Sequence, residues 1–197
     1  MSADDDSHLV ETRIASEVVF SGSLLRVQRD RIRLPDGNEA TREFVVHPGA
    51  ALIVPVLADG RLVLERQFRY PIGRVMLEFP AGKIDAGEVA LATAQRELIE
   101  EVGYASGSWR SLGFIHPQIG YSNETIELFE ARDLTHVGAQ LDEGEFLDVV
   151  MMTESELLAA VDAGLVTDGK TLAALLLWQR RRDADRATGG VPQPRAT

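Results

Sequence analysis

The sequence predicts a mixed α/β (α+β) fold built in layers, with a helix on each side of a sheet and a small antiparallel β-sheet before the main domain. Strand-like segments dominate the first part of the chain, and one strongly helical segment follows them. Further strand patterns then lead to an amphipathic closing helix. With 197 residues, 45% of them apolar, the chain can bury one proper core. We therefore expect one main domain with a small appendage.

The first 48 residues have the pattern of a short antiparallel sheet. Residues 1–8 are acidic, and we expect them to fray. Strands are predicted over residues 17–20, 24–34 and 40–46, separated by Ser-Gly-Ser and Pro-Asp-Gly-Asn turn signals. Because two or three strands alone are marginally stable in water, we expect the region 1–48 to pack on another surface, such as a second subunit in a homodimer.

The main domain, expected over residues 49–182, begins with a continuous apolar run. Residues 50–57 are typical of a buried central strand. Residues 61–69 follow an Ala-Asp-Gly turn and are expected to form its partner strand. The remaining predicted strands are residues 75–79, 109–115, 125–131 and 146–152.

Two helices are expected to close this domain. Thr153 and Glu156 have the spacing of a capping box, which predicts a helix over residues 153–161. Residues 167–180 have the pattern of a last amphipathic helix. Residues 183–197 contain adjacent glycines, two prolines and no apolar periodicity, so we expect a disordered tail.

The helical segment in the middle of the chain carries the strongest pattern. Leu91, Leu98 and Val102 recur at helical intervals without an intervening proline. Gly103 stands where a left-handed C-terminal cap is expected. We therefore expect a helix that ends near Gly103.

Three carboxylates share one face of this helix, because Glu97, Glu100 and Glu101 stand at positions i, i+3 and i+4. Like charges at this spacing repel by about 0.2–0.5 kcal/mol per pair, whereas a hard cation such as Mg²⁺ takes carboxylate oxygens as ligands. The alternative is a solvated acidic helix face. The spacing around the triplet favours the cation. The full pattern is Gly82, five residues, Glu88, seven residues, Arg-Glu, an apolar residue, any residue, Glu-Glu, any residue and Gly. This set of fixed positions would occur by chance in fewer than about one chain in a million.

This stretch, residues 82–104, resembles the Nudix signature at every fixed position, and is called the box below. Tyr104 stands where that family usually has an aliphatic residue. The resemblance implies an α/β/α sandwich with a mixed sheet. It also implies hydrolysis of a nucleoside diphosphate linked to another group, with Mg²⁺ or Mn²⁺ as cofactor. The implied metal ligands are the Ala81 carbonyl and the side chains of Glu97, Glu100 and Glu101.

The resemblance also implies structural roles inside the box. The expected structural residues are Gly82, Glu88, Arg96 and Gly103. Arg96 is expected to pair with a carboxylate such as that of Glu88, since these two positions orient the loop in the family.

The segments around the box look like the ADP-ribose pyrophosphatase branch of the family. These segments are the N-terminal sheet and residues 67–71, 78–83 and 168–171. This likeness implies cleavage of ADP-ribose to AMP and ribose 5-phosphate. The branch commonly has Ser-Pro-Gly in the loop after the box, whereas here Pro117 lies three residues before Gly120. Another nucleoside diphosphate sugar, such as GDP-mannose, is therefore the alternative substrate.

Two loops offer a carboxylate that could activate the attacking water. The loop of residues 142–145 resembles one in bacterial ADP-ribose pyrophosphatases, which implies that Glu143 is the base and Glu145 a metal ligand. Glu124, in the earlier loop, is the rival base. Glu100 is a further catalytic candidate on the helix.

Arginines are expected to position the substrate. Arg69 lies at a predicted strand end and resembles the arginine that grips the substrate in this branch. Arg42, on the N-terminal sheet, could reach across a dimer, although a surface strand charge explains it equally well. Tyr121 completes the predicted substrate-binding set. His47 and His116 are expected to be structural.

The composition argues against several other functions. Twenty basic and 31 acidic residues give a net charge of −11, which disfavours nucleic acid and anionic membranes as partners. The absence of cysteine excludes disulfides, thiolate metal sites and cysteine nucleophiles, and fits a cytoplasmic location. No apolar run approaches the roughly 18 residues of a membrane span. A non-catalytic module that senses nucleotides is the rival from another class. The intact glutamate set and the lack of a basic helix-turn-helix segment count against it.

Overall fold

The structure is a computed structural model that describes residues 6–187. Within this range the chain forms two compact units, residues 6–48 with Gln118–Glu124, and Gly49–Pro117 with residues 125–187. The boundary expected after residue 48 falls between the units. The segment Gln118–Glu124 groups with the first unit, which the sequence did not indicate.

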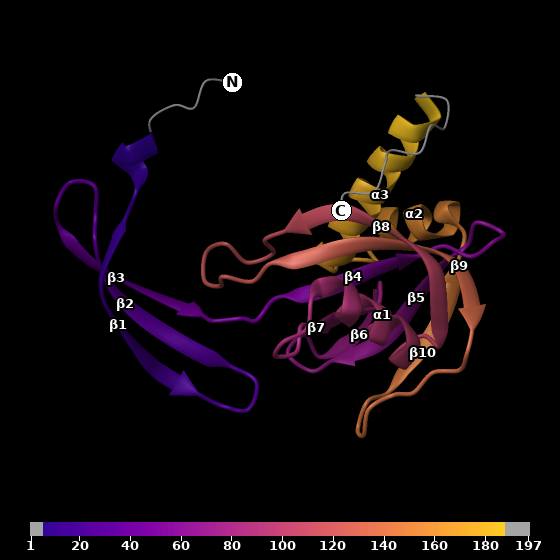
Figure 1. Cartoon of the computed structure of the whole chain (residues 1–197), viewed down its shortest axis with the longest axis horizontal. Coiled ribbons are helices and arrows are strands. Elements are labelled where there is room, and N and C mark those ends of the chain that lie inside the picture. Colours follow the sequence, from indigo (N-terminus) through magenta and orange to yellow (C-terminus); the bar gives the residue numbers. More distant parts are fainter. Residues whose placement is uncertain (1–5, 188–197) are drawn as a thin grey trace. The chain divides into compact units, whose positions relative to one another are not determined.

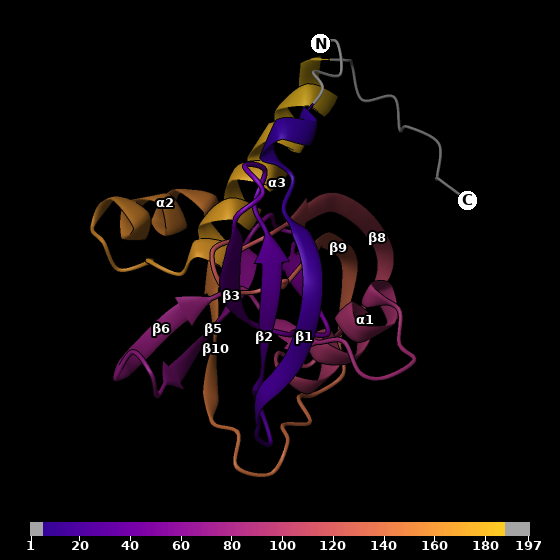
Figure 2. The ribbon, with the colours of Figure 1, turned by 90° about the vertical axis from the view of Figure 1, so that its left-hand side faces the viewer.

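The first unit is a three-stranded antiparallel sheet in the order β1-β2-β3 (Figure 2). Its strands are β1 (Thr12–Ser21), β2 (Arg26–Arg33) and β3 (Glu39–Val45). This confirms the small antiparallel sheet that the sequence predicts. A short 3₁₀ helix, η1 (Asp6–Leu9), precedes it where frayed chain was expected, because the Val10 N–H donates to the Ser7 carbonyl at 3.3 Å. The other residues predicted to fray, 1–5, lie outside the described range.

The second unit contains two sheets and three α-helices within the described residues. The strands are β4 (Ala50–Pro55), β5 (Leu62–Arg69), β6 (Arg74–Glu78), β7 (Ala81–Lys83), β8 (Tyr104–Ile115), β9 (Ile126–His136) and β10 (Leu147–Met152). The helices are α1 (Ala90–Glu100), α2 (Glu154–Asp162) and α3 (Gly169–Ala187). The sheet β7-β4-β9-β8 is mixed, since β4 and β9 run parallel, and the sheet β10-β5-β6 is antiparallel (Figure 1).

The pairing of β5 differs from the prediction. The central strand β4 is buried throughout, as expected, but residues 61–69 do not form its ladder partner. Both edges of β4 are taken by β7 and β9, so the turn after Leu57 leads the chain into the second sheet instead. A single bridge between Val56 and Leu62 joins β5 to the end of β4.

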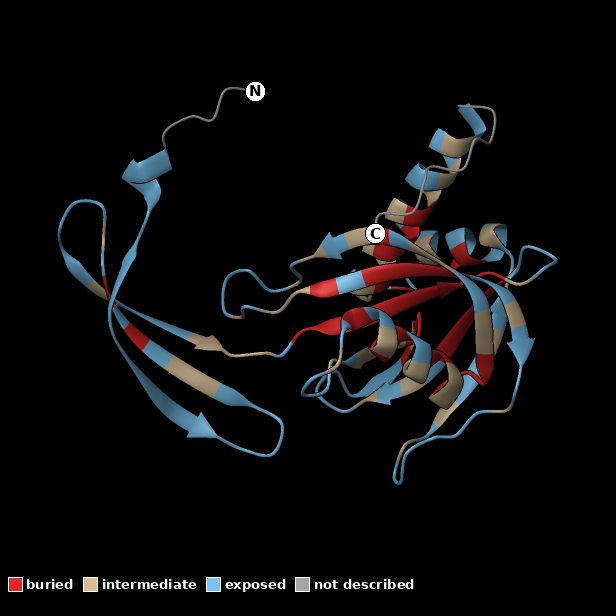
Figure 3. Cartoon of the chain, viewed as in Figure 1, coloured by how far each residue is buried: buried red, intermediate tan, exposed pale blue. Residues whose placement is uncertain are grey.

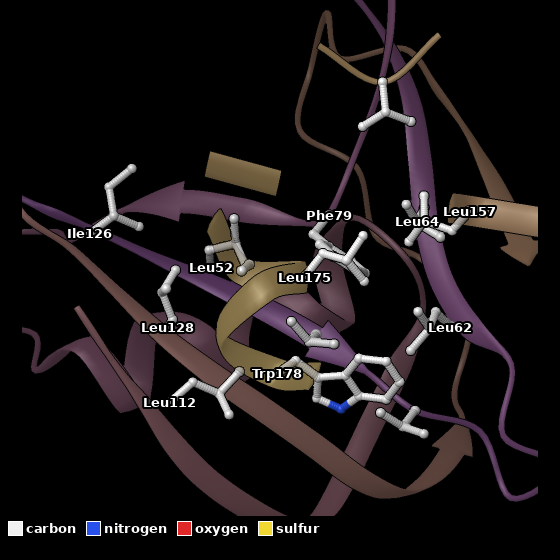
Figure 4. Close-up of a cluster of buried hydrophobic side chains, with 14 of the residues drawn as sticks. Leu52, Leu62, Leu64, Phe79, Leu112, Ile126, Leu128, Leu157, Leu175 and Trp178 are labelled. Atoms are coloured by element: carbon white, nitrogen blue, oxygen red, sulfur yellow. The ribbon is translucent and has the colours of Figure 1, made fainter. Parts of the chain in front are cut away.

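Helices cover both faces of the β4 layer, which confirms the predicted α/β/α sandwich. Alternate residues of β4 point to opposite faces. One face packs Ala51 and Ile53 against apolar side chains of α1. The other face places Leu52 in one apolar cluster with Trp178 of α3 and Leu157 of α2, and Leu157 lies beside Leu64 of β5 (Figure 4). Figure 3 shows that buried residues concentrate on the strands between these helices.

The ends of the helices follow local sequence signals. Gly103 has φ of +75° and its N–H donates to the Ile99 carbonyl at 3.0 Å, so it caps α1 as predicted. Thr153 and Glu156 form the predicted capping box at the start of α2. Leu98 and Val102 of the predicted pattern are buried, whereas Leu91, in the first turn of α1, is 37% exposed.

The closing helix is longer than predicted. Residues 183–187, which the sequence assigned to a disordered tail, are the last part of α3. Two ion pairs anchor this end, from Arg110 Nη2 to Asp185 Oδ1 at 2.8 Å and from Arg182 Nη2 to Glu154 Oε1 at 2.9 Å. The rest of the predicted tail, residues 188–197, lies outside the described range. Among the described helices, none is long and apolar enough to cross a membrane.

Candidate active site

Arg96 organises the acidic face of α1. Its Nη1 donates to Glu97 Oε1 at 2.7 Å and to Glu100 Oε2 at 2.9 Å. Its Nε and Nη2 donate to the two Glu88 oxygens at 3.2 and 3.1 Å. The hydrogen bond from Arg96 and, to a smaller extent, the one from the Thr93 hydroxyl lower the pKa of Glu88 to about 2. The Arg96–Glu88 pair expected from the sequence is therefore present, and it ties the loop before α1 to the helix.

The strand β7 fits closely against the same acids. A Cβ atom on Gly82 would lie 1.8 Å from Glu97 Oε1, so a side chain there would displace the Glu97 carboxylate. The neighbouring Ala81 N–H donates to Glu101 Oε2 at 2.9 Å. The Glu97 carboxylate can therefore keep this position only with glycine at position 82, and Ala81 lies beside Glu101. Whether the Ala81 carbonyl is a metal ligand stays a prediction.

The carboxylates of α1 are buried to different degrees. The side chains of Glu97 and Glu100 are 12% and 29% exposed, and Glu101 is 4% exposed. Burial is the main cause that raises the pKa of Glu101 to about 10, and the negative charges of Glu65, Glu97 and Glu145 raise it further. Burial also raises the pKa of Glu97, against the opposing effect of Arg96. The environment of Glu101 is therefore short of positive charge.

Residues of β5, β6 and α3 surround this cluster, and sequence reasoning missed most of them. Arg69 binds Glu78 in a bidentate pair, with Nε–Oε1 and Nη2–Oε2 distances of 2.8 and 3.0 Å. Lys170 bonds the same Glu78 carboxylate and, at 3.0 Å, Asp168. Arg69 therefore lies within electrostatic reach of Glu101 and is engaged with Glu78, and its predicted contact with substrate stays a prediction. Both partners lie in flanking segments that the branch resemblance singled out.

Glu65 was not predicted at all. Its side chain is fully buried, and neither of its carboxylate oxygens has a hydrogen-bond partner within residues 6–187. The nearest cationic contact is Arg69 Nη2, at 3.9 Å from Glu65 Oε1. Burial raises the pKa of Glu65 to about 7. The available signal was a glutamate directly after the buried apolar residues 62–64 of the same strand.

The later loop contributes Glu145 to the cluster. Gln67 donates a hydrogen bond to Glu145 Oε1 at 3.2 Å, and the Glu145 charge acts on both Glu97 and Glu101. Glu143, two residues earlier, is exposed. The structure therefore brings Glu145 to the box acids, whereas Glu143 stays on the surface of its loop.

Three other predicted site residues belong to the first unit. Glu124 Oε1 lies 3.7 Å from His47 Nδ1. Arg42 Nε donates to Glu11 at 3.0 Å. Tyr121 is exposed, and its carbonyl accepts the Val45 N–H. Their proposed roles toward substrate or water stay predictions.

The donor set of the cluster fits a hard divalent cation. Among residues 6–187, no three acidic or histidine side chains already form a metal-binding group, because Arg96 and the Ala81 N–H hold several of the oxygens. The donors are nevertheless all oxygens, and both Glu65 oxygens are buried without a hydrogen bond in the described structure. Mg²⁺ and Mn²⁺ prefer oxygen ligands, and Mg²⁺ keeps several waters, so it does not need a closed protein cage. Glu65, Glu97, Glu101 and Glu145 could hold such an ion.

Two family models match the chain. A NUDIX domain model matches residues 46–175, and a model described as nucleoside diphosphate sugar hydrolase N-terminal domain matches residues 11–45. The first covers the box and the second unit up to α3, and the second covers the three-stranded sheet.

Relatives of known name match over most of their length. The chain is 36% identical over 169 residues to an ADP-ribose pyrophosphatase of Bacillus subtilis, covering 85% of this chain and 91% of that protein. It is 34% identical over 191 residues to an ADP-ribose pyrophosphatase of Mycobacterium tuberculosis, covering 95% and 89%. A crystal structure of an ADP compounds hydrolase superposes with a TM-score of 0.79 at 26% identity, covering 92% of this chain and 97% of the other. The chain therefore belongs to the Nudix family and is a pyrophosphohydrolase of that family.

Proposed function

We propose that this protein hydrolyses the pyrophosphate of ADP-ribose to AMP and ribose 5-phosphate, with Mg²⁺ bound at the box. The observation that carries this proposal is the acid cluster on α1, packed against Gly82 and surrounded by further carboxylates. The names of the Bacillus and Mycobacterium relatives support the substrate. These names, together with the N-terminal domain model that matches residues 11–45, also support the broader substrate class of nucleoside diphosphate sugars.

The acidic residues of the box and of the later loop are the proposed metal ligands. Glu97, Glu101 and Glu145 would hold the cation, assisted by Glu100 and the Ala81 carbonyl. A bound divalent cation neutralises phosphate charge and lowers the pKa of a ligated water. Arg96 keeps Glu97 and Glu100 on one side of α1 through the hydrogen bonds described above.

The reaction also needs a base and a substrate anchor. We assign the base to Glu143, which takes a proton from the attacking water. Its carboxylate is exposed to water, and Glu145 of the same loop accepts a hydrogen bond from Gln67. Arg69 would bind a substrate phosphate, and Glu78 sets the orientation of its guanidinium. Glu124 is the alternative base, and Arg42 and Tyr121 are further proposed substrate contacts.

A turnover screen tests the substrate. Purified protein with Mg²⁺ is incubated with ADP-ribose, GDP-mannose and other nucleoside diphosphate sugars in ¹⁸O-water, and products are identified by mass. We expect AMP and ribose 5-phosphate from ADP-ribose as the preferred reaction, with ¹⁸O in whichever product contains the attacked phosphorus. Preferred turnover of another sugar nucleotide would refute the ADP-ribose assignment. Loss of turnover in the Glu101→Gln variant controls for contaminating hydrolases.

Another nucleoside diphosphate sugar, such as GDP-mannose, remains the second candidate substrate. The observation that favours it is the loop after the box, where Pro117 and Gly120 depart from the Ser-Pro-Gly of the ADP-ribose branch. The same screen distinguishes the two, because GDP-mannose would yield GMP and mannose 1-phosphate.

We further propose a homodimer that uses the N-terminal sheet. The strand β1 and the turn after it expose large apolar side chains. These are Ile14, Val18, Val19, Phe20, Leu24 and Leu25. Exposed apolar side chains grouped in this way are typical of a protein interface. Sedimentation equilibrium should give twice the mass of the 21.6 kDa chain, and Phe20→Asp should shift it toward the monomer.

A further inference from the structure

Glu65 is a buried carboxylate whose charge the fold does not compensate. The side chain has 0% exposure, and within the described chain neither oxygen accepts a hydrogen bond. Burying an ionised carboxylate without a charge partner or hydrogen bonds is strongly destabilising. An apolar side chain would suit this position in β5 better if packing were its only purpose.

The alternation of β5 directs Glu65 toward α1. Val63, two residues earlier, packs in the same apolar cluster as the buried residues of α1. Successive odd-numbered residues of a strand share a face, so Glu65 continues this face at the point where it becomes polar. In agreement, the negative charge of Glu65 acts on the carboxylate of Glu101. Glu65 is thus aimed into the acid cluster of the box.

The neighbouring cationic side chains do not neutralise the charge of Glu65. Glu78 stands directly opposite it on β6, where like charges repel. Arg69 Nη2 lies 3.9 Å from Glu65 Oε1, but Arg69 binds Glu78 at 2.8 and 3.0 Å. Lys170 also bonds Glu78. The positive charge at this end of β5 is therefore used by Glu78, and Glu65 needs a cation from outside the chain.

We propose that Glu65 is an additional carboxylate of the divalent-cation site and that it holds the cation together with Glu101. This inference rests on the metal-dependent function proposed above. A divalent cation offsets the charges of two buried carboxylates at once, and it takes their oxygens as ligands. The β5 side of the site thereby contributes to metal binding alongside the box helix.

Direct measurement of metal binding tests this inference. Mn²⁺ is titrated into the metal-free full-length protein by isothermal calorimetry, for the wild type and for Glu65→Gln and Glu65→Val. The matched control is Asp148→Asn. Asp148 lies on the adjoining strand β10 opposite Arg66, on the other face of the sheet, and its side chain is 77% exposed. The control removes the same charge without altering the cluster.

Both Glu65 variants should bind Mn²⁺ about ten-fold more weakly or worse, whereas the control should change by less than about two-fold. The melting temperature in EDTA should stay equal or rise in both variants, because an uncompensated charge is removed. The increase in melting temperature on adding Mn²⁺ should shrink.

Unchanged Mn²⁺ affinity in the two variants would overturn the inference, as would the absence of Mn²⁺ binding by the wild type. A lower melting temperature with unchanged affinity would make Glu65 a structural partner of Arg69. Failure of both variants to fold in EDTA or in Mn²⁺ would likewise assign the carboxylate to folding. ADP-ribose turnover by the wild type is scored separately. A wild type that binds Mn²⁺ through Glu65 but does not cleave ADP-ribose would refute the proposed function alone.

Discussion

Replacing Glu101 by glutamine should remove much of the pH dependence of stability in the metal-free protein. Burial is the main cause that raises the pKa of Glu101 to about 10, from 4.5 in the unfolded chain. Between these two values the folded state holds a proton that the unfolded state releases. The free energy of unfolding therefore falls as pH rises through this window, and the stabilising contribution is complete only below pH 4.5.

The size of the effect follows from the width of the window. Each pH unit inside it changes the free energy of unfolding by about 1.4 kcal/mol, so three units from pH 5 to pH 8 amount to as much as ~4 kcal/mol. Glutamine cannot ionise, and its carbonyl can still accept the Ala81 N–H, now 2.9 Å from Glu101 Oε2. The variant should match the wild type near pH 5 and exceed it by as much as ~4 kcal/mol at pH 8. Because burial raises the pKa of Glu65 to about 7, some pH dependence below pH 7 should persist.

Urea unfolding in EDTA, followed by tryptophan fluorescence at pH 5, 6.5 and 8, measures this difference. The control is Glu127→Gln, an exposed position on β9 outside the cluster. Repeating the series in Mg²⁺ should stabilise the wild type at pH 8 and the variant much less, because a ligand that binds only the folded state stabilises it. ADP-ribose turnover should be lost in the variant.

The reasoning fails if Glu101→Gln loses stability between pH 5 and pH 8 as steeply as the wild type. Glu101 would then be ionised in the metal-free fold. Retention of full activity by the same variant would overturn its assignment as a metal ligand, whatever the unfolding data show.

Three further predictions use the geometry of the box and of the two loops. Gly82→Ala should lower kcat/KM by about 100-fold and weaken Mn²⁺ binding in calorimetry, because its Cβ would displace the Glu97 carboxylate. Gly103→Ala should cost about 1–3 kcal/mol in urea unfolding, since φ is +75° and the new Cβ would lie 2.6 Å from a backbone nitrogen. Glu143→Gln should lower kcat by about 10²-fold or more with Mn²⁺ affinity unchanged. If Glu124→Gln alone has that effect in steady-state kinetics, the base lies in the earlier loop.

The box could be predicted from sequence because its chemistry is local. The face shared by Glu97, Glu100 and Glu101 follows from helical spacing alone. Arg96 and Glu88 are eight residues apart, close enough for the loop and the first two turns of α1 to bring them together. The cap at Gly103 likewise depends only on the backbone conformation that glycine tolerates.

The strand side of the site could not be predicted in the same way, since it depends on pairings distant in sequence. Glu65 meets Glu78 only through the register of β5 with β6, and Lys170 reaches Glu78 from 92 residues away. The sequence favoured β5 as the partner of β4, because a short turn between two apolar runs usually joins neighbouring strands. With that pairing, Arg69 at the strand end was expected near the box, but Glu65 was not.

The charges of the described site support the proposed binding of a divalent cation. Arg96 is hydrogen-bonded to Glu88, Glu97 and Glu100, so its positive charge stabilises carboxylates within the box. Arg69 and Lys170 are bonded to Glu78 in the same way. These cations are thus bonded to internal acids before any substrate binds, while Glu65 and Glu101 in their ionised forms would repel each other and a polyphosphate. A divalent cation held by these two carboxylates would offset both effects, because it would supply positive charge to the acids and to the substrate.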